Sequence, residues 1–224
     1  MFSRISNFIN YRRGLAAIRK SGIWFVDIPR TSSSSIRTEL SQHYGPVYGK
    51  SDLQDAALNV QKQLIPSHLT ALEMRQRIGK QSWDDLFTFS IVRNPWDRMI
   101  SIFQYRKAVG EIDQETSYSE YLELFFRKPD DPKSPYHYHG YYYQAIDYLV
   151  DEFGEIMVDY IGRFENREKD LEIVRKKCGC PQLGLLYTQC SPIEQAYSSY
   201  YNQETRDMVS AICKKDIEVF GYQF

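Results

Sequence analysis

The chain has 224 residues, a formal net charge of −1 and an apolar fraction of 42%. This length suits one α/β domain with a sizeable core. The balanced charge excludes a global field that would attract nucleic acid or an anionic membrane, so any anion site must be local. No stretch is long and apolar enough to span a bilayer, and residues 1–20 lack the apolar core of a signal peptide. We therefore expect a cytoplasmic protein with no transmembrane segment and no nucleic-acid partner.

Residues 1–22 are predicted to form an amphipathic helix. Apolar side chains recur at helical spacing at Phe2, Ile5, Phe8 and Ile9, with basic residues between and after them. The apolar face is small, which favours a helix packed on the domain over one lying in a membrane interface. We expect the rest of the chain, residues 23–224, to be a single domain.

Short apolar runs predict three buried strands, each followed by a helix. The strands are expected over residues 23–28, 87–92 and 156–164, and their helices over 33–43, 95–107 and 166–177. Further helices are predicted over residues 53–63, 70–78, 118–127, 142–152 and 203–219, and a loop over 128–140. Strands that alternate with helices predict an α/β fold with a mainly parallel central sheet flanked by helices.

The first two strands each end in a turn that carries basic and hydroxyl side chains. One turn reads Arg30-Thr31-Ser32-Ser33-Ser34-Ser35, and the other reads Arg93-Asn94-Pro95-Trp96-Asp97-Arg98, with Ser101 further along. A helix N-terminus favours anions because its backbone N–H groups and its dipole point at the ligand. Ligands of such sheets bind beyond the carboxyl ends of the strands. The sequence therefore predicts a ligand with two separated phosphate-like groups.

The first turn resembles the 5′-phosphosulfate loop of sulfotransferases that use 3′-phosphoadenosine 5′-phosphosulfate (PAPS), which usually reads Pro-Lys-Thr/Ser-Gly-Gly/Thr-Thr/Ser. The second turn resembles the family's 3′-phosphate motif, with Arg93 and Ser101 eight residues apart. Residues 161–166 and 216–224 are similar to the carbohydrate branch of the family. The resemblance runs from about residue 23 to the C-terminus. It implies a P-loop-like sulfotransferase fold and transfer of a sulfuryl group to an acceptor hydroxyl, with a sugar as the candidate acceptor.

The resemblance also implies roles for individual residues in binding PAPS. Arg30, Thr31, Ser32, Ser33, Ser34 and Ser35 would cradle the 5′ phosphate, and Arg30 would also stabilise the leaving group. The family usually has lysine at Arg30 and glycines where this loop has serines, which leaves open either a different cradle or weakened catalysis. Arg93 and Ser101 would hold the 3′-phosphate, and a structural ion pair is the alternative for Arg93. Phe164 would lie near the adenine, with burial in the core as its alternative.

Sulfuryl transfer is faster when a base removes the proton of the acceptor hydroxyl. Residues 66–71, Pro-Ser-His-Leu-Thr-Ala, resemble the segment in which carbohydrate sulfotransferases place a catalytic histidine, so His68 is the candidate base. His137 and His139 are the other candidates. No metal is required for the implied reaction, and no metal site is predicted.

Two other functions remain open at this point. A phosphotransferase of the P-loop kinase type would share the strand–turn–helix pattern, but the sequence lacks the Gly-x-x-x-x-Gly-Lys-Ser/Thr signature. A non-catalytic nucleotide-binding module of the same fold is favoured by the unusual first turn and disfavoured by His68.

Overall fold

The computed structural model describes residues 12, 14–44, 67–127, 144–179 and 196–224. These residues belong to two compact units, each treated by itself below. Unit 1 comprises Met1–Val92 and Tyr148–Gln189, and unit 2 comprises Arg93–Asp147 and Cys190–Phe224. The single domain expected over residues 23–224 stays a prediction.

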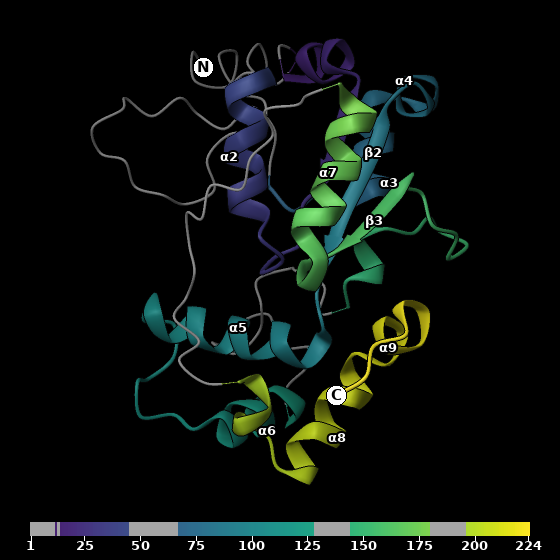
Figure 1. The fold of residues 1–224 in the computed structure, drawn as a ribbon. Helices are drawn as coiled ribbons and strands as arrows, with labels where there is room; N and C mark the ends of the chain where they lie inside the picture. The colour runs from purple at the N-terminus through teal and green to yellow at the C-terminus, as the bar shows by residue number, and fades with distance from the viewer. Residues whose placement is uncertain (1–11, 13, 45–66, 128–143, 180–195) are drawn as a thin grey trace, which may run out of the picture. The chain divides into compact units, whose positions relative to one another are not determined.

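Unit 1 is built on a three-stranded parallel sheet in the order β1-β2-β3 (Figure 1). The strands are β1 (Ile23–Val26), β2 (Phe87–Val92) and β3 (Tyr160–Arg163). β1 and β2 are apolar and almost wholly buried, as expected for parallel strands covered by other elements. Because all three strands run in the same direction, their carboxyl ends lie at one edge of the sheet. The predicted parallel α/β arrangement is confirmed.

In the described part of unit 1, four labelled α-helices flank this sheet. They are α2 (Ser33–Tyr44), α3 (Ala71–Ile78), α4 (Lys80–Asp84) and α7 (Arg167–Cys178). Residues 14–21 are also helical. Most of the predicted N-terminal helix, the predicted helix over 53–63 and the predicted loop over 128–140 lie outside the described residues.

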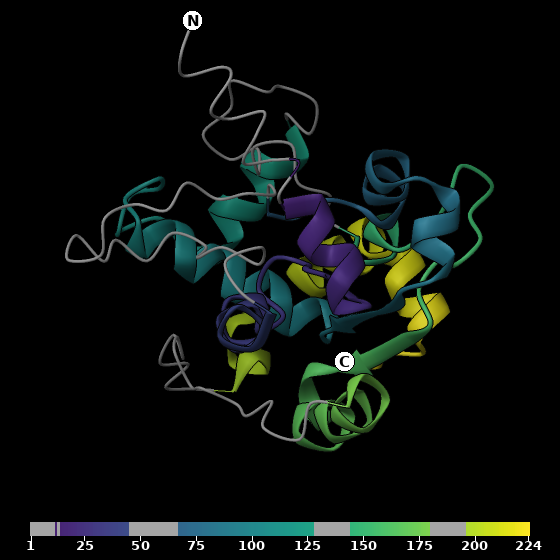
Figure 2. The ribbon, with the colours of Figure 1, turned by 90° about the horizontal axis from the view of Figure 1, so that it is seen from above.

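Helix α7 packs on β2 and β3 (Figures 1 and 2). Gly162, in the middle of β3, permits this close approach. A Cβ atom at Gly162 would lie 2.6 Å from Cδ1 of Ile91 and 2.9 Å from Cβ of Asp170. The carboxylate of Asp170 then accepts hydrogen bonds from the hydroxyl of Tyr160 (2.8 Å) and from the backbone N–H of Arg163 (2.6 Å). The helix is thereby fixed to the last strand.

The ends of α3 follow the sequence closely. Thr70 is the N-cap: its Oγ1 accepts from the N–H of Glu73 at 3.0 Å, and the Glu73 carboxylate accepts from the N–H of Thr70 at 2.8 Å. This reciprocal pair is a capping box, which satisfies two donors at the start of the helix. Gly79 ends the helix with a φ of 89°. The predicted helix over 70–78 and both of its boundaries are confirmed.

Unit 2 is helical in its described residues. Its helices are α5 (Pro95–Ala108), α6 (Tyr118–Arg127), the 3-10 turn η4 (Tyr197–Tyr200), α8 (Gln203–Ile212) and α9 (Lys214–Phe220). The single closing helix predicted over 203–219 is wrong in one respect, because the helix breaks at Cys213, where ψ is 25°. The break places Asp216 of α9 against the backbone N–H groups of Ala145 and Ile146, at 2.7 and 2.8 Å.

The same contact explains why the predicted helix over 142–152 is wrong. The helix among residues 144–152 is limited to a 3-10 turn, η2 (Ile146–Tyr148). Val150, which follows it, forms an isolated antiparallel bridge with Ile156. The N–H groups that would begin a helix donate instead to the Asp216 carboxylate, 70 and 71 residues away. The bridge also shortens the third strand, which begins at Tyr160 rather than at Ile156.

None of the helices in the described part of the chain combines the length and the apolarity needed to cross a membrane.

Candidate active site

The first turn has an unusual backbone. β1 ends at Val26, and α2 begins at Ser33. Between them, Arg30 has a φ of 67° and Ser32 a φ of 70°, both in the left-handed region that residues with a Cβ rarely adopt. Such strain is found mainly where a structure clamps a ligand, and left-handed residues in a turn are typical of backbone nests that bind anions. The backbone of this turn therefore has a conformation that is typical of anion-binding nests.

Side chains of this turn divide into buried and accessible groups. Thr31 and Ser33 are buried, and Oγ1 of Thr31 donates to the carbonyl of Ile28 at 2.9 Å. These hydroxyls belong to the interior of the turn. Arg30 and the other predicted cradle residues, Ser32, Ser34 and Ser35, are half-buried. The structure thus places four of the six predicted residues of this turn where solvent still reaches them.

A buried carboxylate lies directly behind the turn. Asp27 is 5% exposed and accepts hydrogen bonds from Nη1 of Arg37, on α2, and from the backbone N–H of His68 at 2.5 Å. Burial alone would raise the pKa of Asp27. The hydrogen bond and charge of His68, together with those of Arg37, outweigh burial and hold this pKa below its ordinary value. Asp27 is therefore a carboxylate at neutral pH.

His68, the predicted base, is half-buried in the loop before α3 and has a φ of 59°. Its Nδ1 lies 2.9 Å from Oδ1 of Asp27 and 3.0 Å from the carbonyl oxygen of the same residue. Both of those atoms are acceptors, so Nδ1 must carry a proton. In the neutral imidazole the lone pair is then on Nε2, the nitrogen that can act as a base. The alternatives His137 and His139 lie outside the described residues.

Sequence reasoning did not assign Asp27 to the site. The available signal was a carboxylate at the end of an otherwise apolar strand. Charged residues are almost never fully buried unless they are paired, so such a carboxylate predicts a cationic partner.

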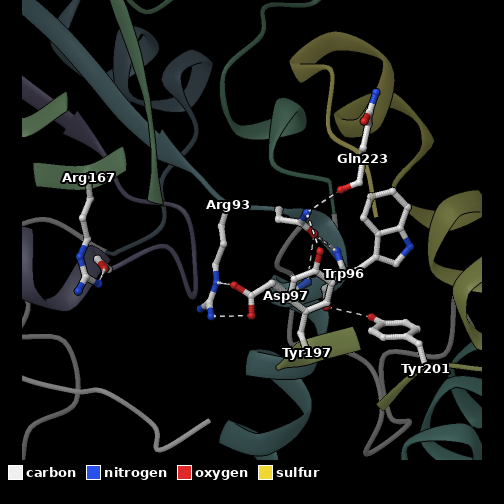
Figure 3. Close-up of polar contacts among 9 residues, drawn as sticks. Arg93, Trp96, Asp97, Arg167, Tyr197, Tyr201 and Gln223 are labelled. Carbon is white, nitrogen blue, oxygen red and sulfur yellow. Dashed lines mark hydrogen bonds and ion pairs between the residues drawn. The ribbon is translucent and has the colours of Figure 1, made fainter. Parts of the chain in front are cut away.

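Phe164 follows β3 directly, in the 3-10 turn η3 (Phe164–Asn166). It is half-buried, and the guanidinium of Arg167 lies over its ring, 4.9 Å from the centroid. Nη1 of Arg167 also lies 3.4 Å from Oγ of Ser32 (Figure 3). Arg167 therefore links the aromatic residue after β3 to the turn after β1. It was not predicted, although a cation in the first turn of the following helix was visible in the sequence.

The second turn lies in unit 2. Asn94 is the N-cap of α5, and its Oδ1 accepts from the N–H groups of Trp96 (3.0 Å) and Asp97 (3.3 Å). Pro95 occupies the first helical position, where a missing N–H has no cost. The amide of Asn94 donates to the carbonyl of Gln223 at 3.0 Å, which fixes the end of the chain to this turn (Figure 3). The Asn-Pro sequence is therefore explained by capping.

Arg93 is 7% exposed and forms a two-point ion pair with Asp97, as Figure 3 shows. The predicted partner in binding, Ser101, is a buried residue of α5 in the same unit. Arg98 is also buried, and its charge acts on Asp216: burial raises the pKa of Asp216, and Arg98 opposes this rise. Arg98 is thus part of the interior of unit 2. Trp96 is buried as well, with its ring edge-on to Phe224 at 5.6 Å.

Among the residues that the structure describes, no group of three or more histidine, cysteine, aspartate or glutamate side chains is arranged to hold a metal ion.

Unit 1 is thus an α/β unit with a left-handed strand-to-helix turn and an Asp27–His68 pair, and unit 2 begins with a capped strand-to-helix turn. The sulfotransferase family model matches residues 15–223, and the chain belongs to this family. An uncharacterized protein of Archaeoglobus fulgidus is 29% identical over 121 residues, which cover 51% of this chain and 85% of that relative. No solved structure matches the chain.

Proposed function

We propose that the protein transfers the sulfuryl group of PAPS to the hydroxyl of an acceptor, and that it belongs to the carbohydrate branch of its family, with a sugar as acceptor. Membership of the sulfotransferase family supports the reaction class. The observation that carries the proposal is the first turn. Its left-handed Arg30 and Ser32 lie between β1 and α2, and Asp27 connects the same strand end to His68.

The first turn would bind the 5′ end of the donor. Backbone N–H groups at the start of α2 and the hydroxyls of Ser32, Ser34 and Ser35 would meet the phosphate oxygens. Arg167, which lies 3.4 Å from Ser32, would add a second cation beside Arg30. The ring of Phe164, directly after β3, would lie near the adenine.

The second turn would bind the 3′-phosphate. Asp97 engages Nε and Nη2 of Arg93 and so fixes the plane of the guanidinium. We assign the guanidinium of Arg93 to the phosphate, because a planar guanidinium matches the geometry of phosphate oxygens. Ser101, two helical turns into α5, would supply a hydroxyl, since side chains on a helix lean towards its N-terminus.

The proposed transfer needs one base and one cation at the reacting atoms. Nε2 of His68 would take the proton of the acceptor hydroxyl as its oxygen forms a bond to sulfur. The bond between sulfur and the bridging oxygen of the 5′ phosphate breaks at the same time, and its electrons remain on the phosphate of the product, adenosine 3′,5′-bisphosphate. Arg30 would stabilise the charge that develops on this leaving group. The hydroxyl proton ends on His68, and the sulfuryl group ends on the acceptor.

A non-catalytic nucleotide-binding module is the second candidate. It is favoured by the replacement of the usual lysine and glycines in the first turn, since serine in place of glycine leaves left-handed strain at Ser32. Both functions predict binding of the nucleotide, but only the sulfotransferase predicts transfer of the sulfuryl group.

The experiment is a transfer assay with sulfur-labelled PAPS and a panel of sugars, phenols and alcohols, in buffer with a metal chelator. Label on an acceptor hydroxyl, formed in step with the bisphosphate, would support the proposal, and a sugar among the labelled acceptors would support the branch. Binding of the bisphosphate without labelling of any acceptor would favour the non-catalytic module. Transfer of phosphate from ATP that requires magnesium would favour a kinase.

A further inference from the structure

We propose that Asp27 is a positioning residue that fixes the tautomer and the orientation of the His68 ring. This inference deepens the proposed function, because it concerns the base of that reaction, and it rests on that function for its catalytic meaning. Its structural content stands on contacts within unit 1 alone.

Asp27 holds His68 at two places, its backbone N–H and its ring. Oδ1 of Asp27 accepts from the backbone N–H of His68 and lies 2.9 Å from its Nδ1. The carbonyl oxygen of Asp27 lies 3.0 Å from the same ring nitrogen. The backbone contact holds a residue whose φ of 59° is unfavourable for a side chain with a Cβ. The ring contact leaves one tautomer, with the proton on Nδ1.

Asp27 is itself fixed and ionised. Among the described residues, the charged groups that contact it include Arg37, from α2, and His68. Arg37 and Asp27 are both about 5% exposed, so the ion pair is screened little by solvent. Arg37 engages Oδ2, which leaves Oδ1 directed at His68. Hydrogen bonds from Arg37 and His68 to its two oxygens therefore hold the carboxylate of Asp27 in one orientation.

This geometry has a chemical consequence for a base. A carboxylate that accepts the Nδ1 proton keeps Nε2 unprotonated in the neutral ring and stabilises the imidazolium that forms when Nε2 takes up a proton. A carboxamide at the same place can present its NH₂ to Nδ1, which would favour the other tautomer. Asp27→Asn should therefore change which nitrogen of His68 carries the proton.

The test is nitrogen NMR on the full chain with ¹⁵N-labelled histidine, at a pH where the imidazole is neutral. The chain has four histidines, and a His68→Gln variant assigns the signal of His68. We expect the wild-type signal of a protonated Nδ1 and an unprotonated Nε2, and a shift towards the opposite tautomer in Asp27→Asn. The matched control is Asp159→Asn, which removes another carboxylate of unit 1, one that accepts from the N–H and the hydroxyl of Thr88 at 2.7 Å. It should leave the His68 signal unchanged.

The tautomer in the wild type is read without any substitution at Asp27, so the inference can fail even if Asp27→Asn does not fold. A double variant, Asp27→Asn with Arg37→Gln, removes both charges of the buried pair and serves if the single variant is unfolded. A proton on Nε2 in the wild type, or an unchanged tautomer in the folded variants, overturns the inference.

Failure of the proposed function is recorded separately, by the lack of sulfuryl transfer from PAPS, and leaves the NMR result unaffected. With an acceptor from the panel, Asp27→Asn should lower kcat about 10- to 100-fold without a matching rise in KM, the size of loss typical when a metal-bound histidine loses the group that orients it.

Discussion

Arg93 and Asp97 form a two-point ion pair across the first turn of α5, with Nε 2.7 Å from Oδ2 and Nη2 2.9 Å from Oδ1. Both side chains are largely shielded from solvent, at 7% and 15% exposure. The aspartate also sits in the first turn of the helix, where a negative charge interacts favourably with the helix dipole. The pair fixes the direction of the guanidinium, which is the property that a phosphate-binding arginine needs.

We predict that Arg93→Ala weakens binding of adenosine 3′,5′-bisphosphate by about 2–4 kcal/mol, because it removes the cationic partner of the 3′-phosphate from a desolvated charge pair. AMP, which lacks the 3′-phosphate, should lose much less. Titration calorimetry with both ligands measures the difference. Arg106 is a matched control, since it is also a buried arginine of α5 paired with a carboxylate, Glu111, at 2.9 Å. Equal losses for the two ligands in Arg93→Ala would exclude the assignment.

Arg30→Ala should lower turnover by about 10²- to 10³-fold and change PAPS affinity far less. The reason is that a cation at the leaving phosphate acts most strongly as charge develops in the transition state. Arg30→Lys should retain much of the activity, since it keeps the charge. Steady-state kinetics beside PAPS binding measure this split, and normal turnover in Arg30→Ala would show that the residue has no such role.

His68→Ala should cut turnover by about two to four orders of magnitude and leave bisphosphate binding near the wild-type value, as expected when a general base is lost. His43, an exposed histidine in α2 of the same unit, provides the control. His43→Ala should turn over normally. If His68→Ala also does so with the true acceptor, the base lies elsewhere, and His137 and His139 become the next candidates.

Gly162→Ala should destabilise the fold by about 1–3 kcal/mol, the usual cost of overpacking a well-packed interior. The added Cβ would meet Cδ1 of Ile91 at 2.6 Å. Ile91→Val removes that atom, so the double variant should be more stable than the sum of the two single changes predicts. Denaturant unfolding of the three variants measures the coupling, and strict additivity would show that the side chain of Ile91 moves away from the added Cβ at little cost.

Asp27 should contribute to stability in a pH-dependent way. Its pKa in the folded protein is lowered from 3.8, so the unfolded chain binds its proton more readily and the contribution is fully present above that value. As the pH falls from about 4 through the lowered folded pKa, the contribution is lost. The stability difference between wild type and Asp27→Asn, or the double variant with Arg37→Gln, should therefore shrink as the pH falls below about 4. Unfolding curves from about pH 5 to pH 3 test this, and a difference that grows as the pH falls below about 4 would contradict the sign.

Much of the framework could be predicted because its signals are local. The bounds of β2 follow from a run of residues that, apart from Ser90, are all apolar or β-branched, and those of α3 follow from Thr70, Glu73 and Gly79. The Asn-Pro turn is equally local, since the cap of α5 and its first proline are adjacent in sequence.

What the sequence could not provide are the contacts between distant segments. The expected helix over 142–152 fails because Asp216 captures its first N–H groups from about 70 residues away. The role of Asp27 depends on His68, which lies 41 residues further along the chain. In both cases the partners of a buried carboxylate are set by tertiary packing. Helix propensity depends on local sequence and therefore does not predict such partners.

The most direct test of the account is calorimetry of the wild-type protein with adenosine 3′,5′-bisphosphate and with AMP, in buffer with a metal chelator. If the two turns serve the two ends of PAPS, the bisphosphate should bind without magnesium and more tightly than AMP by about the 2–4 kcal/mol assigned to Arg93. Equal affinity for the two ligands, or binding that appears only when magnesium is added, would contradict a PAPS-dependent sulfotransferase.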